Sequence, residues 1–292
     1  MAAIARPRRS VLYMPGSKER ALEKAKTLPA DALILDLEDA VSPDEKPAAR
    51  ALVAAAVKAR GFGKREVIIR TNGLDTEWGE ADLAAAAEAG PDAILVPKVN
   101  GPEDIHAVDK AISAAPASTT IWAMMETPLG ILNAREIAAS SPRLACFVMG
   151  TNDLVKELHA AHTPDRVAMV PSLAICLLAA RAYGLACIDG VYNAFKDDDG
   201  LRAACEQGKA MGFDGKTLIH PAQLDVANMV FGPGEAELEE ARTQVAAFEE
   251  AQAEGRGVAV VNGRIVENLH VENARRLLAE AEAIAALEAD TA

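Results

Sequence analysis

The segment DALILDLED, residues 31–39, followed by PDEKPAARALVAAAVKAR, residues 43–60, contains the unit that decides the fold. Its first part is a short apolar run bounded by acidic residues, which is typical of a buried β-strand. Its second part is rich in alanine, has an early proline and places apolar residues at helical spacing. We therefore expect a strand followed directly by a helix.

The same order occurs eight times along the chain. The other expected strands are SVLYMPG (10–16), EVIIRTNG (66–73), DAILVPKVN (92–100), TIWAMMET (120–127), LACFVMGTND (144–153), LACIDGVY (185–192) and GKTLIHP (215–221). Eight β-then-α units predict an α/β protein whose residues 1–230 form a closed (β/α)₈ TIM barrel. An open, doubly wound sheet is the competing fold, but no GxGxxG motif follows the first expected strand.

Residues 235–292 are expected to form an appendage of helix, hairpin and helix. An acidic helix over 235–254 precedes GVAVVNGRIVEN, in which Asn262-Gly263 between apolar residues predicts a type I′ hairpin. LHVENARRLLAEAEAIAAL, residues 269–287, has the pattern of an amphipathic helix. A segment of this size cannot bury a good core alone. We expect it to pack on its own barrel or on a neighbouring one, at a subunit interface.

Composition excludes several classes of function. The net charge of −13 argues against nucleic acid as a partner, and the longest apolar runs fall short of the ~20 residues that span a bilayer. The four cysteines form no CxxC motif, and the N-terminal sequence lacks the apolar stretch of a secretory signal. We expect a cytoplasmic protein. Residues 1–26 carry seven basic residues against two acidic ones, which suits either a solvated surface or an anionic ligand.

Ionisable residues follow the expected strands at the ends where TIM barrels place their active sites. They are Asp36, Glu38, Asp39, Arg70, Lys98, Glu126, Asp153, Asp189 and His220. His220 suits a structural hydrogen bond as well as a functional role. The other positions together predict a site.

Glu126, in MMETPLG (124–130), poses the sharpest question, because a buried carboxylate requires a cation, a metal or a proton. Asp153 follows the neighbouring strand, so the two carboxylates are expected to share a divalent ion. Hard oxygen ligands without nearby histidine or cysteine favour Mg²⁺, with Mn²⁺ possible. The alternative for Asp153 is a helix cap.

Arg70 opposite such a metal would provide a bidentate fork for a carboxylate. The alternative is a plain ion pair with Asp36 or Glu38. A small acid held by the metal and Arg70 presents an oxygen to the metal, which favours making or breaking a C–C bond beside an enolate.

Seven motifs resemble the HpcH/HpaI aldolase/citrate lyase family, in particular its citrate lyase β-subunit-like CoA-ester lyases. They are RSVLYMPGSKERALEKA, LILDLEDAVSPDEKPAAR, IIRTNG, ILVPKV, METPLGILNAREIA, FVMGTNDLVKEL and GFDGKTLIHPAQ, which lie within residues 9–223. The resemblance as a whole runs over about residues 9–280. The resemblance implies a phosphoenolpyruvate/pyruvate-type barrel that depends on Mg²⁺. It implies cleavage of a β-hydroxyacyl-CoA such as malyl-, citramalyl- or citryl-CoA into a 2-oxo acid and an acyl-CoA. It also implies a homotrimer or homohexamer.

The resemblance also implies roles for individual residues. It makes Glu126 and Asp153 metal ligands, Arg70 a catalytic residue that grips the oxo-acid carboxylate, Glu38 a catalytic residue, Asp36, Gly150 and Thr151 substrate-binding residues, and Lys18, Arg20 and Lys24 CoA contacts. The acids of LDLED would support metal-bound waters.

One segment departs from the family pattern. Where the lyases have a proton-transferring aspartate supplied across a subunit interface, RIVENLH (264–270) has Glu267, and Leu269 replaces a proline. The extra methylene can displace the carboxylate by about 1 Å. We therefore keep a (3S)-malyl-CoA thioesterase as the alternative to the lyase. Two further alternatives are a citrate lyase β subunit acting on a carrier protein and an aldolase that uses no CoA.

Overall fold

The computed structural model describes residues 6–291, which divide into two compact units, one over residues 8–231 and one that includes residues 232–290. The predicted ranges 1–230 and 235–292 include residues 1–5 and 292, which lie outside the described part of the chain. The two units are described separately.

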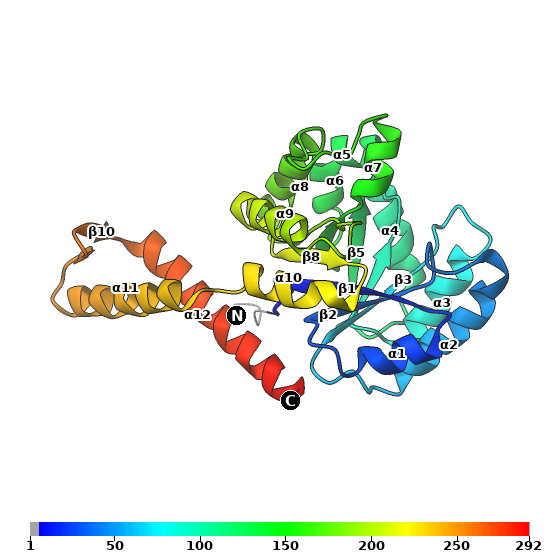
Figure 1. The fold of residues 1–292 in the computed structure, drawn as a ribbon, viewed down its shortest axis with the longest axis horizontal. Helices are drawn as coiled ribbons and strands as arrows, with labels where there is room; N and C mark the ends of the chain where they lie inside the picture. Colours follow the sequence, from blue (N-terminus) through cyan, green and yellow to red (C-terminus); the bar gives the residue numbers. More distant parts are fainter. Residues whose placement is uncertain (1–5, 292) are drawn as a thin grey trace. The chain divides into compact units, whose positions relative to one another are not determined.

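Residues 8–231 form a closed barrel of eight parallel strands in sequence order, which confirms the predicted TIM barrel (Figure 1). The strands are β1 (Ser10–Pro15), β2 (Ala32–Asp36), β3 (Glu66–Arg70), β4 (Ala93–Val96), β5 (Thr120–Met125), β6 (Leu144–Met149), β7 (Ala186–Asp189) and β8 (Gly215–Leu218). Pairing of β1 with both β2 and β8 closes the barrel.

Each strand lies within its predicted run and ends before that run does. β2 shows the physical reason: the Asp36 carboxylate accepts hydrogen bonds from the amides of Glu38 and Ala40, at 2.9 and 3.0 Å. This turn bends the chain away from the strand direction. The acids that follow β2 consequently lie in a loop at the carboxyl end of the barrel.

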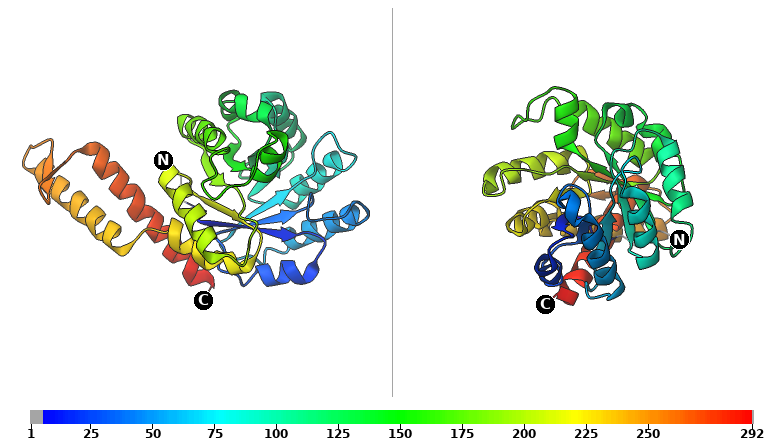
Figure 2. Two further views of the ribbon diagram at one scale, coloured as in Figure 1. Left: turned by 45° about the horizontal axis from the view of Figure 1, so that its top comes forward. Right: turned by 90° about the vertical axis from the view of Figure 1, so that its right-hand side faces the viewer.

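Helices surround the strands in every view of Figures 1 and 2. In this unit they are α1 (Glu19–Ala25), α2 (Lys46–Lys58), α3 (Gly79–Ala89), α4 (Pro102–Ala111), α5 (Pro128–Leu132), α6 (Ala134–Ala138), α7 (Thr151–Glu157), α8 (Val170–Ala182), α9 (Asp198–Met211) and α10 (Leu224–Phe231), with 3₁₀ turns at Pro43–Glu45 and Pro221–Gln223. No helix in the described part of the chain is long and apolar enough to cross a membrane.

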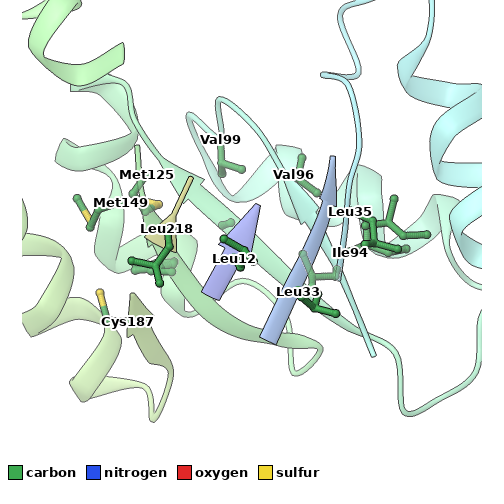
Figure 3. Packing of buried hydrophobic residues seen from close by; sticks show 14 of the residues in the cluster. Leu12, Leu33, Leu35, Ile94, Val96, Val99, Met125, Met149, Cys187 and Leu218 are labelled. Atoms are coloured by element: carbon green, nitrogen blue, oxygen red, sulfur yellow. The ribbon is translucent and has the colours of Figure 1, made fainter. Parts of the chain in front are cut away.

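Alternation along the strands sorts the core into two layers. Leu12, Leu33 and Leu35 belong to the cluster that the helices share, and Figure 3 shows them among other buried side chains. Val11 and Ile34 belong to a second cluster whose buried members all come from strands, which fills the barrel interior. A residue's place in this alternation therefore decides whether it faces the helices or the inside of the barrel.

The second unit contains α11 (Glu235–Ala253), the antiparallel strands β9 (Ala259–Val261) and β10 (Arg264–Val266), and α12 (Asn268–Thr291). Asn262 and Gly263 have φ values of 50° and 76°, as a type I′ hairpin requires. The predicted order of helix, hairpin and helix is confirmed (Figure 1).

Candidate active site

A cavity of about 420 Å³ opens at the carboxyl ends of the barrel strands. Its lining residues come from most of the strands and the loops that follow them. They are Tyr13, Pro15, Asp36, Asp39, Ala40, Arg70, Met124, Glu126, Met149, Gly150, Thr151, Asn152, Asp153, Val191, Thr217 and Ile219. The cavity therefore brings together seven residues with predicted site roles, namely Asp36, Asp39, Arg70, Glu126, Gly150, Thr151 and Asp153.

Glu126 follows β5 directly and is only 1% exposed. Its Oε1 accepts a hydrogen bond of 2.8 Å from the backbone amide of Lys98, and Lys98 has the left-handed φ of 53°. Burial, and then the charge of Glu38, raise the pKa of Glu126 to about 8, with Asp153 adding to the effect. A carboxylate surrounded by like charges is stabilised when a cation joins the cluster.

Gly150 makes the room that Glu126 occupies. A Cβ atom at position 150 would overlap both Cβ and Oε2 of Glu126. Because Cβ cannot swing away from its own backbone, any other residue at 150 would displace the carboxylate. The segment GTND, residues 150–153, thus leaves space for Glu126 through its glycine and carries Asp153 at its end.

Asp153 lies in the first turn of α7, after its N-cap Gly150, and makes no side-chain capping bond. Among residues 6–291, no ion pair joins Glu126 or Asp153 to a basic side chain. The cap predicted as the alternative for Asp153 is therefore absent, and its carboxylate remains available to a ligand.

The donor set suits a hard cation. The described residues contain no group of three His, Cys, Asp or Glu side chains arranged to hold a metal. Mg²⁺ commonly takes only one or two protein carboxylates and completes its shell with water and substrate oxygens. Glu38 Oε2 is buried and forms an ion pair with Arg70 Nη1 at 2.6 Å. Glu126, Asp153 and their surroundings thus fit a water-rich Mg²⁺ site.

Arg70 ends β3 and points into the cavity from the barrel interior. Its Nε and Nη2 donate to Asp36 Oδ1 and Oδ2, each at 2.7 Å, and its guanidinium lies 4.8 Å from the centroid of the Tyr13 ring. The predicted alternative of an ion pair with Asp36 or Glu38 is therefore present. Asp36 uses the Nε–Nη2 edge of Arg70, and Nη1 lies 2.6 Å from Glu38 Oε2 and 3.5 Å from Oδ2 of Asp39, which lines the cavity.

A buried lysine, Lys46, binds the loop that follows β2 and carries Glu38 (the Glu38 loop). Lys46 Nζ donates to the carbonyls of Leu37 and Glu38, both at 2.9 Å, and to Asn72 Oδ1 at 2.7 Å. Burial raises the pKa of Glu38, while the Arg70 charge opposes that rise. Lys98 Nζ lies 3.6 Å from Glu38 Oε1.

The predicted CoA contacts do not line the cavity. Lys18, Arg20 and Lys24 lie exposed at the start of α1 or on it, and Lys18 Nζ is 3.2 Å from Glu45 Oε1. Glu267 is exposed in the second unit, where it immediately precedes α12 and its backbone amide donates to His270 Nδ1 at 3.2 Å. The roles of these four residues remain predictions.

Asp189 was expected to belong to the ring of site residues, and it does not line the cavity. It is fully buried, and both Lys216 Nζ and Arg166 Nη1 lie 2.8 Å from its carboxylate. It alternates with Ile188 of the interior cluster and therefore faces the helices. His220 caps the 3₁₀ turn through Nδ1 and stacks on Phe195 with ring centroids 4.6 Å apart, a structural role.

Tyr13, Met124 and Thr217 line the cavity although sequence reasoning assigned them no role. The alternation of SVLYMPG contained the signal for Tyr13, because it shares the interior parity of Val11. Met124 shares the parity of Trp122 in the same way.

Comparisons with known proteins agree with this geometry. Residues 9–221 match the model of the family described as HpcH/HpaI aldolase/citrate lyase. The chain is 62% identical over 289 residues to the (3S)-malyl-CoA thioesterase of Cereibacter sphaeroides strain ATCC 17029, a match that covers 99% of this chain and 100% of the relative. It is 37% identical over 284 residues to the citrate lyase subunit beta of Escherichia coli K12, covering 95% and 94% of the two chains. The structure of CitE from Mycobacterium tuberculosis, in complex with magnesium, acetoacetate and coenzyme A, superposes with a TM-score of 0.78 at 27% identity, covering 96% of this chain and 100% of that one.

Proposed function

Because the chain belongs to the HpcH/HpaI aldolase/citrate lyase family, we propose that it is a Mg²⁺-dependent enzyme that hydrolyses (3S)-malyl-CoA to malate and CoA. The observation that carries this proposal is the 62% identity to a (3S)-malyl-CoA thioesterase over essentially the whole of both chains. In the reaction, water adds to the thioester carbonyl, the C–S bond breaks, and the CoA thiol leaves with a proton.

A Mg²⁺-dependent lyase that splits a β-hydroxyacyl-CoA into a 2-oxo acid and an acyl-CoA is the second candidate. The 37% identity to a citrate lyase subunit beta favours it, whereas Glu267 in place of the lyase aspartate counts against it. Because 37% is lower than the 62% identity to the thioesterase, the lyase is the second candidate function. A subunit that acts on a carrier-protein thioester is a third candidate, supported by the same relative.

Glu126 and Asp153 would hold the Mg²⁺, which when bound polarises the substrate oxygen that it contacts. Arg70, aligned by Asp36, would orient the substrate carboxylate through its Nη1 side. Gly150 and Thr151 border the same cavity and would contact the acyl part of the substrate. Glu38 does not line the cavity but is paired with Arg70, which does, and with Lys98, and from there it would hold metal-bound water.

The exposed Lys18, Arg20 and Lys24 would contact the phosphates of CoA, an anionic ligand that suits this basic segment. Four free, buried cysteines agree with a reducing compartment, and we place the protein in the cytoplasm.

The second unit supports assembly into a homotrimer or homohexamer. Its hairpin and the start of α12 expose Val260, Ile265 and Leu269 at 67%, 65% and 63%, an apolar surface that suits a protein partner. Glu267 lies beside this surface and would reach the thioester of a neighbouring copy as an acid or base. For the lyase candidate, which forms a thioester enolate, replacing Glu267 by alanine should abolish exchange of the thioester α-protons of acetyl-CoA with deuterated solvent, measured by NMR. Unchanged exchange would remove Glu267 from the mechanism.

The deciding experiment supplies (3S)-malyl-CoA with Mg²⁺ and follows thiol and glyoxylate in parallel. Thiol release without glyoxylate supports the thioesterase, whereas glyoxylate formed with acetyl-CoA supports the lyase. Glu126→Gln and a chelator serve as controls, since both should stop either reaction. Turnover only when the acyl group is carried on an acyl-carrier protein would contradict both the CoA thioesterase and the CoA-ester lyase.

A further inference from the structure

Tyr13, on β1, lines the cavity, and its ring lies against Arg70. The guanidinium carbon of Arg70 is 4.8 Å from the ring centroid, a cation–π contact, and the ring packs against the interior cluster of strand residues. The ring is therefore fixed from both sides. The position of its hydroxyl is fixed with it.

Two hydrogen-bond donors converge on one weak acceptor at this point. Tyr13 Oη lies 3.8 Å from Met124 Sδ, and Arg70 Nη1 lies 3.7 Å from the same sulfur. A thioether accepts hydrogen bonds poorly. Among the described residues, Tyr13 Oη has no other hydrogen-bond partner, and all three side chains line the cavity. A polar group that is this well positioned and this poorly satisfied suits a ligand oxygen.

We propose that Tyr13 is a substrate-contacting, specificity-determining residue, whose hydroxyl donates to the same substrate carboxylate that Arg70 Nη1 contacts. This inference rests on the proposed function, because it assigns a second receptor for the free carboxylate of a malyl thioester. Glu38 and Asp39 also lie near Arg70 Nη1, at 2.6 and 3.5 Å, and their negative charges weaken its attraction for a substrate carboxylate. The neutral Tyr13 hydroxyl adds a second hydrogen bond to that carboxylate.

The hydroxyl remains a donor throughout the working range of pH. Burial raises the pKa of Tyr13, and the Arg70 charge only partly opposes that rise. A protonated phenol aimed at a carboxylate favours substrates that carry one. A site built to hydrogen-bond a group rejects an analogue without it more strongly than an apolar pocket could, because the donor is then left unpaired.

The test uses Tyr13→Phe, which keeps the ring and its stacking and removes one oxygen. Tyr183→Phe is the matched control, since Tyr183 is 42% exposed at the end of α8 and outside the cavity. Calorimetry with Mg²⁺ present measures the binding of (S)-malate and, separately, of CoA to each protein. We expect Tyr13→Phe to weaken malate binding by about 10- to 100-fold, the range for a lost hydrogen bond to a charged group. CoA binding should stay within about twofold of wild type.

A second readout compares kcat/KM for malyl-CoA with that for 3-hydroxybutyryl-CoA, which has a methyl group in place of the carboxylate. In Tyr13→Phe the preference for malyl-CoA should fall by about tenfold or more. Malate affinity and preference both within twofold of wild type would overturn the inference while leaving the proposed function intact. Equal weakening of malate and CoA would also overturn it, by showing general damage. Failure of the wild-type protein to bind malate at all would overturn the proposed function together with the inference.

Discussion

Asp36 accepts two hydrogen bonds from Arg70, from Nε to Oδ1 and from Nη2 to Oδ2, each 2.7 Å long. Both residues are buried, and Asp36 also accepts the amides of Glu38 and Ala40. The Asp36 carboxylate therefore fixes the plane of the guanidinium and the course of the following loop together. Its structural role is to aim the Nη1 side of Arg70 at the cavity.

Arg70→Lys should remove the oriented group that binds the substrate carboxylate. An ammonium group can pair with Asp36 but cannot also present a planar second edge to a substrate. We expect KM for malyl-CoA to rise by about 30-fold or more, while inhibition by CoA alone changes by less than about threefold. Steady-state kinetics with CoA as a competitive inhibitor measures both. Equal changes in the two constants would contradict a specific role in carboxylate binding.

Glu126→Gln should separate the metal site from the stability of the fold. Since burial and Glu38 raise the folded-state pKa of Glu126 to about 8, the metal-free protein loses stability as pH rises from the unfolded value of about 4.3 toward 8. Without Mg²⁺ near pH 8, the glutamine variant should therefore be at least as stable as wild type. With Mg²⁺ at about 100 times Kd, wild type should gain about 2.7 kcal/mol, and the variant much less.

Thermal unfolding with and without Mg²⁺, together with calorimetric Mg²⁺ titration, measures these differences. Glu157→Gln is the control, because Glu157 is exposed at the end of α7 and does not line the cavity. A glutamine variant that binds Mg²⁺ as tightly as wild type would show that the ion, if bound, lies elsewhere.

Lys46→Met should loosen the Glu38 loop. The substitution leaves the carbonyls of Leu37 and Glu38 and the Asn72 side chain without their buried donor. We expect the free energy of unfolding to fall by about 2–3 kcal/mol and Mg²⁺ binding to weaken, because Glu38 moves. Lys58→Met, on the exposed side of the same helix, is the control for chemical denaturation and metal titration. Loss of stability with unchanged metal affinity would restrict Lys46 to a structural role.

Asp189→Asn should destabilise the barrel in a pH-dependent way. Burial alone would raise the pKa of Asp189, but Lys216 and Arg166 outweigh burial and lower it. Its contribution is therefore fully present above the unfolded pKa of about 3.9 and is lost as pH falls through the lower folded-state pKa. At neutral pH the variant should lose about 3–5 kcal/mol, because Lys216 is left buried and unpaired.

The stability difference between Asp189→Asn and wild type should narrow below about pH 4. Urea denaturation at several pH values checks this, with Asp198→Asn as an exposed control on α9. A difference that is constant over the whole pH range would mean that the charge of Asp189 is not its stabilising feature.

The order of strands and helices followed from apolar runs and their periodicity, since burial on both faces of a parallel strand leaves a strong sequence signal. The site was harder, because a polar residue at a strand end can face either side. Asp36 and Arg70 share the interior parity of Ile34 and Ile68, whereas Asp189 shares that of the helix-facing Cys187. Counting this alternation would have removed Asp189 from the predicted site residues and added Tyr13 to them. Which edge of Arg70 pairs with Asp36 and which atom meets Glu38 depends on rotamers, which no spacing encodes.

Gly150 limits how this cavity can be redesigned. Because any side chain there would collide with Glu126, random libraries that include position 150 would mostly yield proteins with a displaced acid, whatever substrate they were selected for. Efforts to alter acyl-chain preference are better directed to Val191, Thr217 and Ile219, which border the same space from β7 and β8 and their loops. Gly150, the smallest residue that lines the cavity, is thus a position for an engineer to leave unchanged.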